Sequence, residues 1–435
     1  MSKSRSNMTD VISGSADGEM IFWDLPRQKA LFQINAHERF VRGTCFARNH
    51  ALSADTLFVS TGDDAKVCIW SLNALKHQYT ESLNGLADEA AGSIFKNYTP
   101  KASYGSKMQL LGCDASYEED IFATAGAVVQ VWSYERSTPI QSFKTWDVDT
   151  ITKLKFNPSE TSLLASVCND RSLIFYDLRG KSALQKVYLK NKSAALCWNP
   201  QEPMNIVIVS KLTHCAILKK GDTPFVITHT IHCLFANPCF HFFSFQGNEN
   251  ANCYTFDMRK LDEPKMIHKD HISAILDIDF APTGKEFAAA SFDKTIRIFP
   301  FNEGRSREVY HTKRMQQVNA ILYSNDAKYL VSGSEDTNVR IWKSNAADAI
   351  KPLLPREKEK LAYANKLKKK YKNTKEVKRI MRHSHLPKLL IKKQKQKQIK
   401  KMAKFRKEEN MRVNNRPEDC PFVPQRKADM DFKFE

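Results

Sequence analysis

A chain of 435 residues with 42% hydrophobic content is long enough for two or three domains with packed cores. No apolar run follows its basic start, and its apolar stretches are short and interrupted, which argues against a secretory signal and a membrane protein. Ten cysteines without a Cys-x-x-Cys pair fit reduced thiols in the cytosol or nucleus.

One phrase recurs through the first 350 residues. A strand of small residues leads into a turn that contains an Asp, and a β-rich strand ending in an aromatic residue follows. In five copies the turn Asp lies six residues before the aromatic, at Asp17, Asp64, Asp170, Asp293 and Asp336. Because an Asp at a tight turn accepts backbone N–H bonds, we expect these five side chains to be structural.

The spacing of the phrase indicates the fold. Two weaker copies end at Trp132 and Phe256, and the seven aromatic positions are separated by 47, 62, 44, 80, 43 and 43 residues. A period of about 40–45 residues is typical of WD repeats, each of which forms one four-stranded blade. The sequence therefore predicts an all-β fold, a seven-bladed WD40 β-propeller over residues 1–350.

Two segments depart from this pattern. The first turn Asp lies only 17 residues into the chain, and Met1–Thr9 does not look able to supply the strands that should precede Val11, so we expect an incomplete first blade. Residues 206–244 contain no blade phrase, and removing these 39 residues would leave a normal spacing of 41. We interpret 206–244 as an atypical insertion or retained non-coding sequence. Its His and Cys residues match no zinc-ligand spacing, which favours an irregular loop.

His37 and His271 stand where strands begin in two of the blades. Each could be catalytic or bind a metal, but a structural hydrogen bond is favoured because other blades have residues there that could not share such chemistry.

The last fifth of the chain carries most of its net charge. Residues 351–435 contain 28 Lys and Arg against 10 Asp and Glu, whereas the preceding 350 residues contain 39 and 38. Apolar residues at helical spacing predict three helices: one after Pro355, one after Thr374 as an N-cap, and one after Pro387. The sequence thus predicts a basic α-helical C-terminal extension over 351–435.

Such an extension binds polyanions, since each neutralised phosphate releases counterions. We expect an RNA- or ribonucleoprotein-binding arm whose side chains contact phosphates. The residues expected to do so are Lys368, Lys369, Lys370, Lys378, Arg379, Arg382, Lys388, Lys392 and Lys393. A nuclear or nucleolar targeting signal is an alternative. A helix on anionic membrane is disfavoured, because the apolar stripe is thin and lacks Trp.

Four strings carry a resemblance to a known family: Ser291–Pro300, Ser306–Gln316, Val377–Lys388 and Tyr254–Arg259. With the blade pattern and the basic extension, they resemble the Sof-type (suppressor of fibrillarin) WD-repeat proteins. These join a seven-bladed propeller to a basic C-terminal Sof-like domain, which would correspond to 351–435. Family members also carry an N-terminal extension and a complete first blade.

The resemblance implies a component of the small-subunit processome in the nucleolus, supporting 18S pre-rRNA processing with the box C/D small nucleolar RNP. Its partners would be processome and snoRNP proteins, and pre-rRNA or snoRNA through the tail. An alternative role is substrate receptor of a cullin-RING ubiquitin ligase, with Arg179 and Arg259 of two Asp-x-Arg boxes binding the adaptor. Each Arg could equally pack over its own blade edge.

Catalysis is not expected. No nucleophile elbow, phosphate-binding glycine loop, metal motif or pair of catalytic carboxylates is recognisable. The fixed offset of the blade Asp residues marks them as structural. The sequence therefore predicts a non-enzyme without cofactor or metal.

Overall fold

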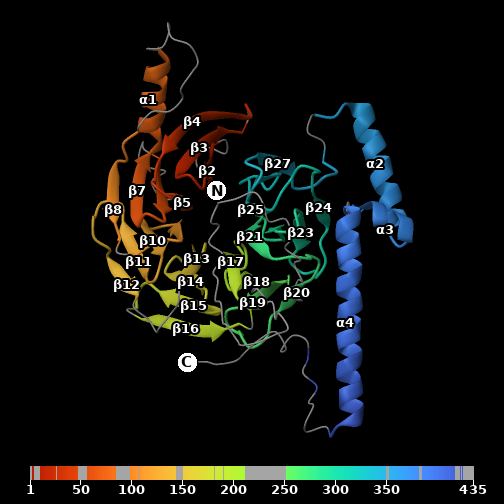
Figure 1. Ribbon diagram of the computed structural model, residues 1–435. Helices are drawn as coiled ribbons and strands as arrows, with labels where there is room; N and C mark the ends of the chain where they lie inside the picture. The colour runs from red at the N-terminus through yellow and green to blue at the C-terminus, as the bar shows by residue number, and fades with distance from the viewer. Residues whose placement is uncertain are drawn as a thin grey trace, which may run out of the picture.

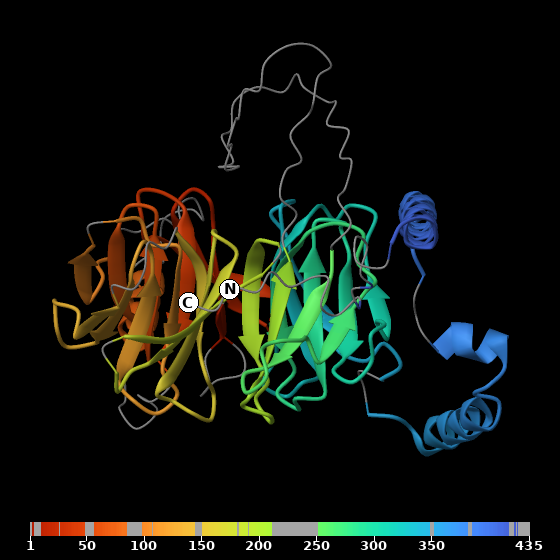
Figure 2. The same ribbon diagram turned by 90° about the horizontal axis from the view of Figure 1, so that it is seen from below.

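The computed structural model describes residues 2–3, 10–25, 27–47, 56–84, 98–106, 108–143, 150–180, 182–189, 191–210, 251–348, 352–381, 385–416, 422 and 424. Over these residues the chain forms seven antiparallel sheets arranged around a central axis, followed by helices beside the ring (Figure 1). Seen from below, the sheets stand side by side as upright blades (Figure 2). The predicted seven-bladed propeller with a helical C-terminal region is confirmed.

We number the sheets as blades 1 to 7 in chain order. Blade 1 contains β1 (Ser2–Lys3), β2 (Asp10–Gly14), β3 (Glu19–Asp24) and β4 (Lys29–Asn35). Blade 2 contains β5 (Val41–Phe46), β6 (Leu57–Gly62), β7 (Lys66–Ser71) and β8 (Ala102–Gly105). Blade 3 contains β9 (Gly112–Ala115), β10 (Ile121–Ala125), β11 (Val129–Ser133) and β12 (Gln141–Phe143).

The remaining blades follow the same order. Blade 4 contains β13 (Ile151–Phe156), β14 (Leu163–Cys168), β15 (Ser172–Asp177) and β16 (Ala183–Tyr188). Blade 5 contains β17 (Ser193–Trp198), β18 (Asn205–Ser210), β19 (Cys253–Asp257) and β20 (Met266–His268). Blade 6 contains β21 (Ile275–Phe280), β22 (Glu286–Ser291), β23 (Ile296–Pro300) and β24 (Glu308–Tyr310). Blade 7 contains β25 (Val318–Tyr323), β26 (Tyr329–Ser334) and β27 (Val339–Lys343).

The expectation that the first blade is incomplete is wrong. Blade 1 has four strands, because Ser2 and Lys3 pair with Ile12 and Val11 as the short strand β1. Blade 7 is the sheet with three strands in the described part of the chain. Its outer edge is β27, where Ile341 is exposed. A two-residue strand has no sequence signature, whereas the turn phrase that marks each blade is present in blade 1.

The predicted insertion at 206–244 begins too early. Residues Ile206–Val209 are fully buried in β18, which pairs with β17 on one side and β19 on the other. The apolar run Asn205–Ser210 is a central strand, and central strands buried on both faces lack the alternation of polar and apolar residues. Residues 211–244, the rest of the predicted insertion, lie outside the described residues.

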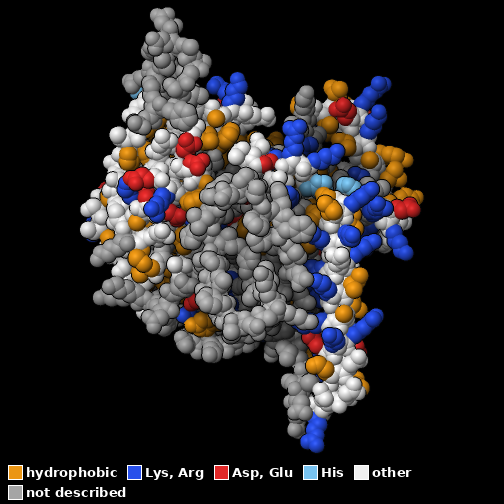
Figure 3. Space-filling view, viewed as in Figure 1, with side chains coloured by type: hydrophobic (Ala, Val, Ile, Leu, Met, Phe, Trp, Pro, Cys, Tyr) orange, Lys and Arg blue, Asp and Glu red, His pale blue; other side chains and the backbone are white. Residues whose placement is uncertain are grey.

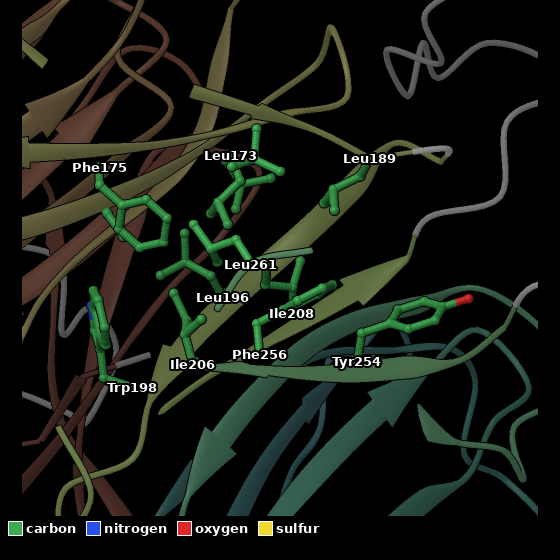
Figure 4. Packing of buried hydrophobic residues seen from close by; sticks show 13 residues of the cluster. Leu173, Phe175, Leu189, Leu196, Trp198, Ile206, Ile208, Tyr254, Phe256 and Leu261 are labelled. Carbon is green, nitrogen blue, oxygen red and sulfur yellow. The ribbon is translucent and has the colours of Figure 1, made fainter. Parts of the chain in front are cut away.

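The core lies between neighbouring blades. Side chains of blades 4 and 5, among them Phe175, Trp198 and Phe256, form one such cluster (Figure 4). The second strands of blades 2 and 4, Leu57–Gly62 and Leu163–Cys168, are buried along their whole length, because each blade has a neighbour on both faces. The first strands of successive blades contact one another around the axis. The cysteines that the structure describes are free thiols, and all but Cys197 are buried.

The helices are of two kinds. Helix α1 (Leu72–Asn84), which the sequence analysis did not predict, follows β7 and places Leu72 and Leu75 in a cluster between blades 1 and 2. Helices α2 (Pro355–Lys370), α3 (Lys375–Met381) and α4 (Lys388–Asn414) form the predicted basic extension. Thr374 immediately precedes α3 as predicted, and its carbonyl accepts from the Lys378 amide at 3.1 Å. Its hydroxyl, however, donates to the Tyr371 carbonyl at the end of α2.

Candidate functional site

The turn Asp of blade 2 is part of a buried hydrogen-bonded chain. Trp70 Nε1 donates to Ser60 Oγ at 3.0 Å, and Ser60 in turn contacts His37 Nε2 at 2.8 Å. His37 Nδ1 donates to Asp64 at 3.0 Å, and Asp64 also accepts from the Lys66 amide at 3.2 Å. The imidazole has partners for both ring nitrogens and is buried. Here His37 has the structural contacts that the sequence analysis favoured over catalysis.

Blade 6 repeats the contact between the His and the turn Asp, but Ala289 and Phe299 stand in place of Ser60 and Trp70, and His271 Nε2 has no hydrogen-bond partner among the described residues. Asp293 accepts hydrogen bonds from His271 Nδ1, the Ile272 amide, and the amide and hydroxyl of Thr295. Burial lowers the pKa of His271 below its ordinary value. Burial alone would raise the pKa of Asp293, but the His271 contact, the nearby Arg297 and the Thr295 hydrogen bond hold it below its ordinary value.

The other turn Asp residues are less uniform. Asp170 accepts from the Ser172 amide at 3.0 Å and lies 3.6 Å from the buried Lys186 ammonium, while Asp336 pairs with Arg340. The expectation is wrong for Asp17, whose side chain is exposed. In that turn the hydroxyl of Ser15 accepts the amides of residues 17 and 19 at 3.2 and 3.3 Å. A Ser hydroxyl performs the same local capping as an Asp carboxylate.

All five turns share a backbone feature. The residue after each Asp has a positive φ: 88° at Gly18, 58° at Ala65, 72° at Arg171, 65° at Lys294 and 64° at Thr337. Four of the five are not glycine, so these turns hold a conformation that L-residues adopt at a cost. The repeated hydrogen bonds of the turn offset that cost, which is why the Asp recurs at a fixed offset.

Acidic side chains on the first strands join neighbouring blades, a role that the sequence analysis missed. Asp114 of β9 accepts from the Phe156 amide of β13 at 2.9 Å and pairs with Lys155 at 3.1 Å. Asp277 and Asp279 of β21 accept from backbone amides of β25 in the same way, at 3.1 and 2.7 Å. The acids lie in the strands and not in the turn phrase, so only the ring geometry reveals their partners.

Metal sites are not evident. Among the described residues no group of three or more His, Cys, Asp or Glu is placed to hold a metal ion. The His and Asp residues of the turns lie instead within the blades, in hydrogen bonds to their own sheet.

The helical extension is the most basic part of the surface. Lys369, Lys370, Lys378, Arg379, Lys388, Lys392 and Lys393 are exposed, Lys368 is half-buried, and Arg382 lies outside the described residues. Figure 3 shows Lys and Arg side chains along α2 and α4, interspersed with hydrophobic ones. The predicted residues lie on three separate helices, so they form a long arm and not one compact patch.

Polar contacts between described residues join this arm to the propeller. The Lys397 ammonium of α4 donates to the His271 carbonyl at 3.0 Å, and His311 Nε2 donates to the His385 carbonyl at 2.9 Å. Both propeller residues belong to connections that enter first strands, one before blade 6 and the other before blade 7. Helix α4 consequently runs alongside these blades (Figures 1 and 2).

The two Asp-x-Arg boxes adopt the same local structure in adjacent blades. Asp177 ends β15 and accepts from the Arg179 amide at 3.0 Å; Asp257 ends β19 and accepts from the Arg259 amide at 3.0 Å. Both Arg side chains are exposed. Because each box follows the third strand of its blade, the two Arg lie at the same end of blades 4 and 5.

Comparison with known proteins defines the class to which this propeller and arm belong. A WD domain, G-beta repeat, matches residues 28–71, 262–299 and 307–343, and a Sof1-like domain matches residues 344–430. The chain is therefore a WD-repeat propeller with a Sof1-like C-terminal domain.

Full-length relatives place it more narrowly. It is 37% identical over 426 residues to DDB1- and CUL4-associated factor 13 of Danio rerio and 38% identical over 427 residues to that of Homo sapiens, in each case over 98% of this chain and 82% of the relative. It is 34% identical over 433 residues to Protein SOF1 of Saccharomyces cerevisiae, over 98% of this chain and 79% of that protein. The chain belongs to the Sof1 family, which confirms the resemblance seen in the sequence.

A transmembrane role finds no support in the helices. Of those that the structure describes, none is both long and apolar enough to cross a bilayer.

Proposed function

We propose that this protein is a non-catalytic ribosome biogenesis factor of the small-subunit processome, supporting 18S pre-rRNA processing together with the box C/D small nucleolar RNP. The observation that carries the proposal is the division of charge, with a nearly neutral propeller and an exposed helical arm rich in Lys. Membership of the Sof1 family supports it.

In this proposal the propeller and the arm have different partners. The propeller is a platform for processome and snoRNP proteins, since buried hydrogen bonds hold its turns within a blade and join neighbouring blades. The arm binds pre-rRNA or snoRNA through phosphates, with Lys and Arg as point charges and little base readout. A nuclear and nucleolar location follows from these partners.

The test is deletion of residues 351–435. The propeller ends at Lys343, so the truncation removes the arm and leaves every blade. We expect loss of nucleolar retention and of co-sedimentation with pre-ribosomes, measured by imaging and gradient fractionation. Normal co-sedimentation of a folded truncation would contradict the proposal.

A second candidate function is substrate receptor of a cullin-RING ubiquitin ligase. The identical turns of the two Asp-x-Arg boxes, with both Arg exposed at one end of adjacent blades, favour it. Relatives that carry the name DDB1- and CUL4-associated factor 13 suggest DDB1 as the adaptor. An Arg so placed could donate a forked pair of hydrogen bonds to an acidic or carbonyl acceptor.

The ligase role can be tested separately from the role in ribosome biogenesis. Changing Arg179 and Arg259 to Ala should abolish DDB1 binding in a pull-down and leave pre-ribosome association intact. The matched control is Arg27→Ala, an exposed Arg that also follows a third strand, in blade 1. Unchanged DDB1 binding by the double variant would exclude the two boxes as the adaptor contact.

A further inference from the structure

Helix α4 has exposed apolar side chains in the part of the chain that the structure describes. It has 27 residues and is about 40 Å long, and none of its described side chains is buried. Ile399, Met402, Phe405 and Val413 are each at least half exposed. An isolated basic helix gains nothing from such residues in water, where an exposed apolar row marks a contact surface.

These residues lie on one side of the helix. Ile399, Met402 and Phe405 follow one another at intervals of three, and Val413 returns to the same side two turns later, so they form a stripe. Lys393, Lys400, Lys404 and Lys407 are spaced by seven, four and three residues and form a separate row. At 3.6 residues per turn the centres of the two rows are nearly opposite.

The contact with the propeller lies on a different side of α4 from the apolar stripe. Lys397, which donates to the His271 carbonyl, lies between the two rows, and Leu390 and Gln394 on the same side are half-buried. The centre of the stripe is therefore about a third of a turn around α4 from the side that meets the blades. Figure 3 shows hydrophobic side chains on the visible face of α4.

We propose that the apolar stripe of α4 docks into an apolar groove of a partner protein whose rim is acidic. We infer an acidic rim because α4 carries 11 Lys and Arg against 2 Glu, and opposite charges meet across protein interfaces. Lys395 and Arg406 lie on the same side of the helix as the stripe, one turn from Ile399 and Met402 respectively, where they would meet acidic side chains of the groove. This goes beyond the proposed function, in which the basic arm contacts RNA. If the opposite Lys row makes that contact, the helix would be held between a protein and an RNA.

The test places a photoreactive diazirine amino acid in the full chain, in cells, at Met402 within the stripe or at Lys400 within the Lys row. After irradiation and nuclease treatment, mass spectrometry maps the crosslinked segment. We expect position 402 to crosslink to one defined protein segment that combines apolar residues with flanking Asp and Glu. A crosslink from 402 to RNA, to a basic segment, to its own propeller or to nothing would overturn the proposal.

Two double variants make the test specific. Ile399→Gln with Phe405→Gln should reduce the crosslink from 402 at least tenfold, because a few apolar anchors dominate such interfaces. Leu389→Gln with Met411→Gln removes two exposed apolar residues outside the stripe and should leave it unchanged. Gln is a good helix former, so both variants keep the helix. If both variants reduce the crosslink from position 402 equally, the apolar stripe is not the contact surface.

The crosslink from position 400 reports separately on the proposed function. RNA at 400 with an acidic protein segment at 402 supports both statements. Protein at 402 without RNA at 400 supports the groove and counts against the RNA contact of this row.

Discussion

The Lys row of α4 allows a quantitative test of RNA binding. Lys393, Lys400, Lys404 and Lys407 are exposed on one face of a continuous helix, so a single RNA backbone could contact all four. Each phosphate contact contributes about 0.7–0.9 to the slope of log affinity against log salt concentration. Replacing the four with Gln should therefore reduce the slope for an 18S pre-rRNA transcript by about 3.

The slope converts into an affinity ratio. Between 50 and 200 mM salt, a slope difference of about 3 means that the wild-type protein loses about sixtyfold more affinity than the variant. Filter binding or fluorescence anisotropy across a salt series measures this. At low salt the variant should bind more weakly, and the two should converge as salt rises.

A control of equal net charge separates local contact from overall charge. Replacing Lys29, Lys101, Lys285 and Lys313, which are exposed on the propeller, removes the same four charges far from α4 in sequence. This control should keep nearly the full slope. If the α4 variant retains the wild-type slope, or if both variants lose it equally, the assignment of RNA binding to this row is refuted.

Three further predictions concern the propeller. Thr337→Gly should stabilise the protein by about 0.5–1 kcal/mol in urea unfolding, because the β-branched Thr337 is held at a φ of 64°. A loss of stability would show that the Thr337 backbone is not strained. Asp114→Ala should lower the free energy of unfolding by about 3 kcal/mol, because the Phe156 amide and Lys155 lose their acceptor. Asp262→Ala, at an exposed position, should lower it little. Equal losses would refute the role of Asp114 between blades. Burial lowers the pKa of His268 from 6.5 to about 4. The neutral ring therefore contributes fully to the free energy of unfolding above pH 6.5. As the pH falls from 6.5 toward 4 the protein loses this stability, by at most about 3 kcal/mol. The His268→Gln variant should show a shallower loss of unfolding free energy over that range.

Some contacts of the site residues could be predicted from the sequence, and others could not. The His37 and Asp64 contacts could be anticipated, since a His at a strand entry and an Asp at a fixed offset recur together. Asp17 carries the same offset, yet Ser15 closes its turn, because two side chains compete for the same amides and only geometry selects one. The Lys residues of the arm follow from composition, but their separation into an Lys row and an apolar stripe on α4 depends on where that helix begins and ends.

The repeating turn phrase by itself determined the propeller, because each blade is built from hairpins whose turn and strands lie within about 40 residues of one another. The tertiary structure decided what depends on distant partners. It assigned Ile206–Val209 to the centre of blade 5, paired Ser2 and Lys3 with β2, and left blade 7 as the three-stranded sheet. It also joined Asp114 to β13 and set α4 beside blades 6 and 7. The physical reason is that ring closure and docking bring together residues far apart in the chain, where no local pattern records the contact.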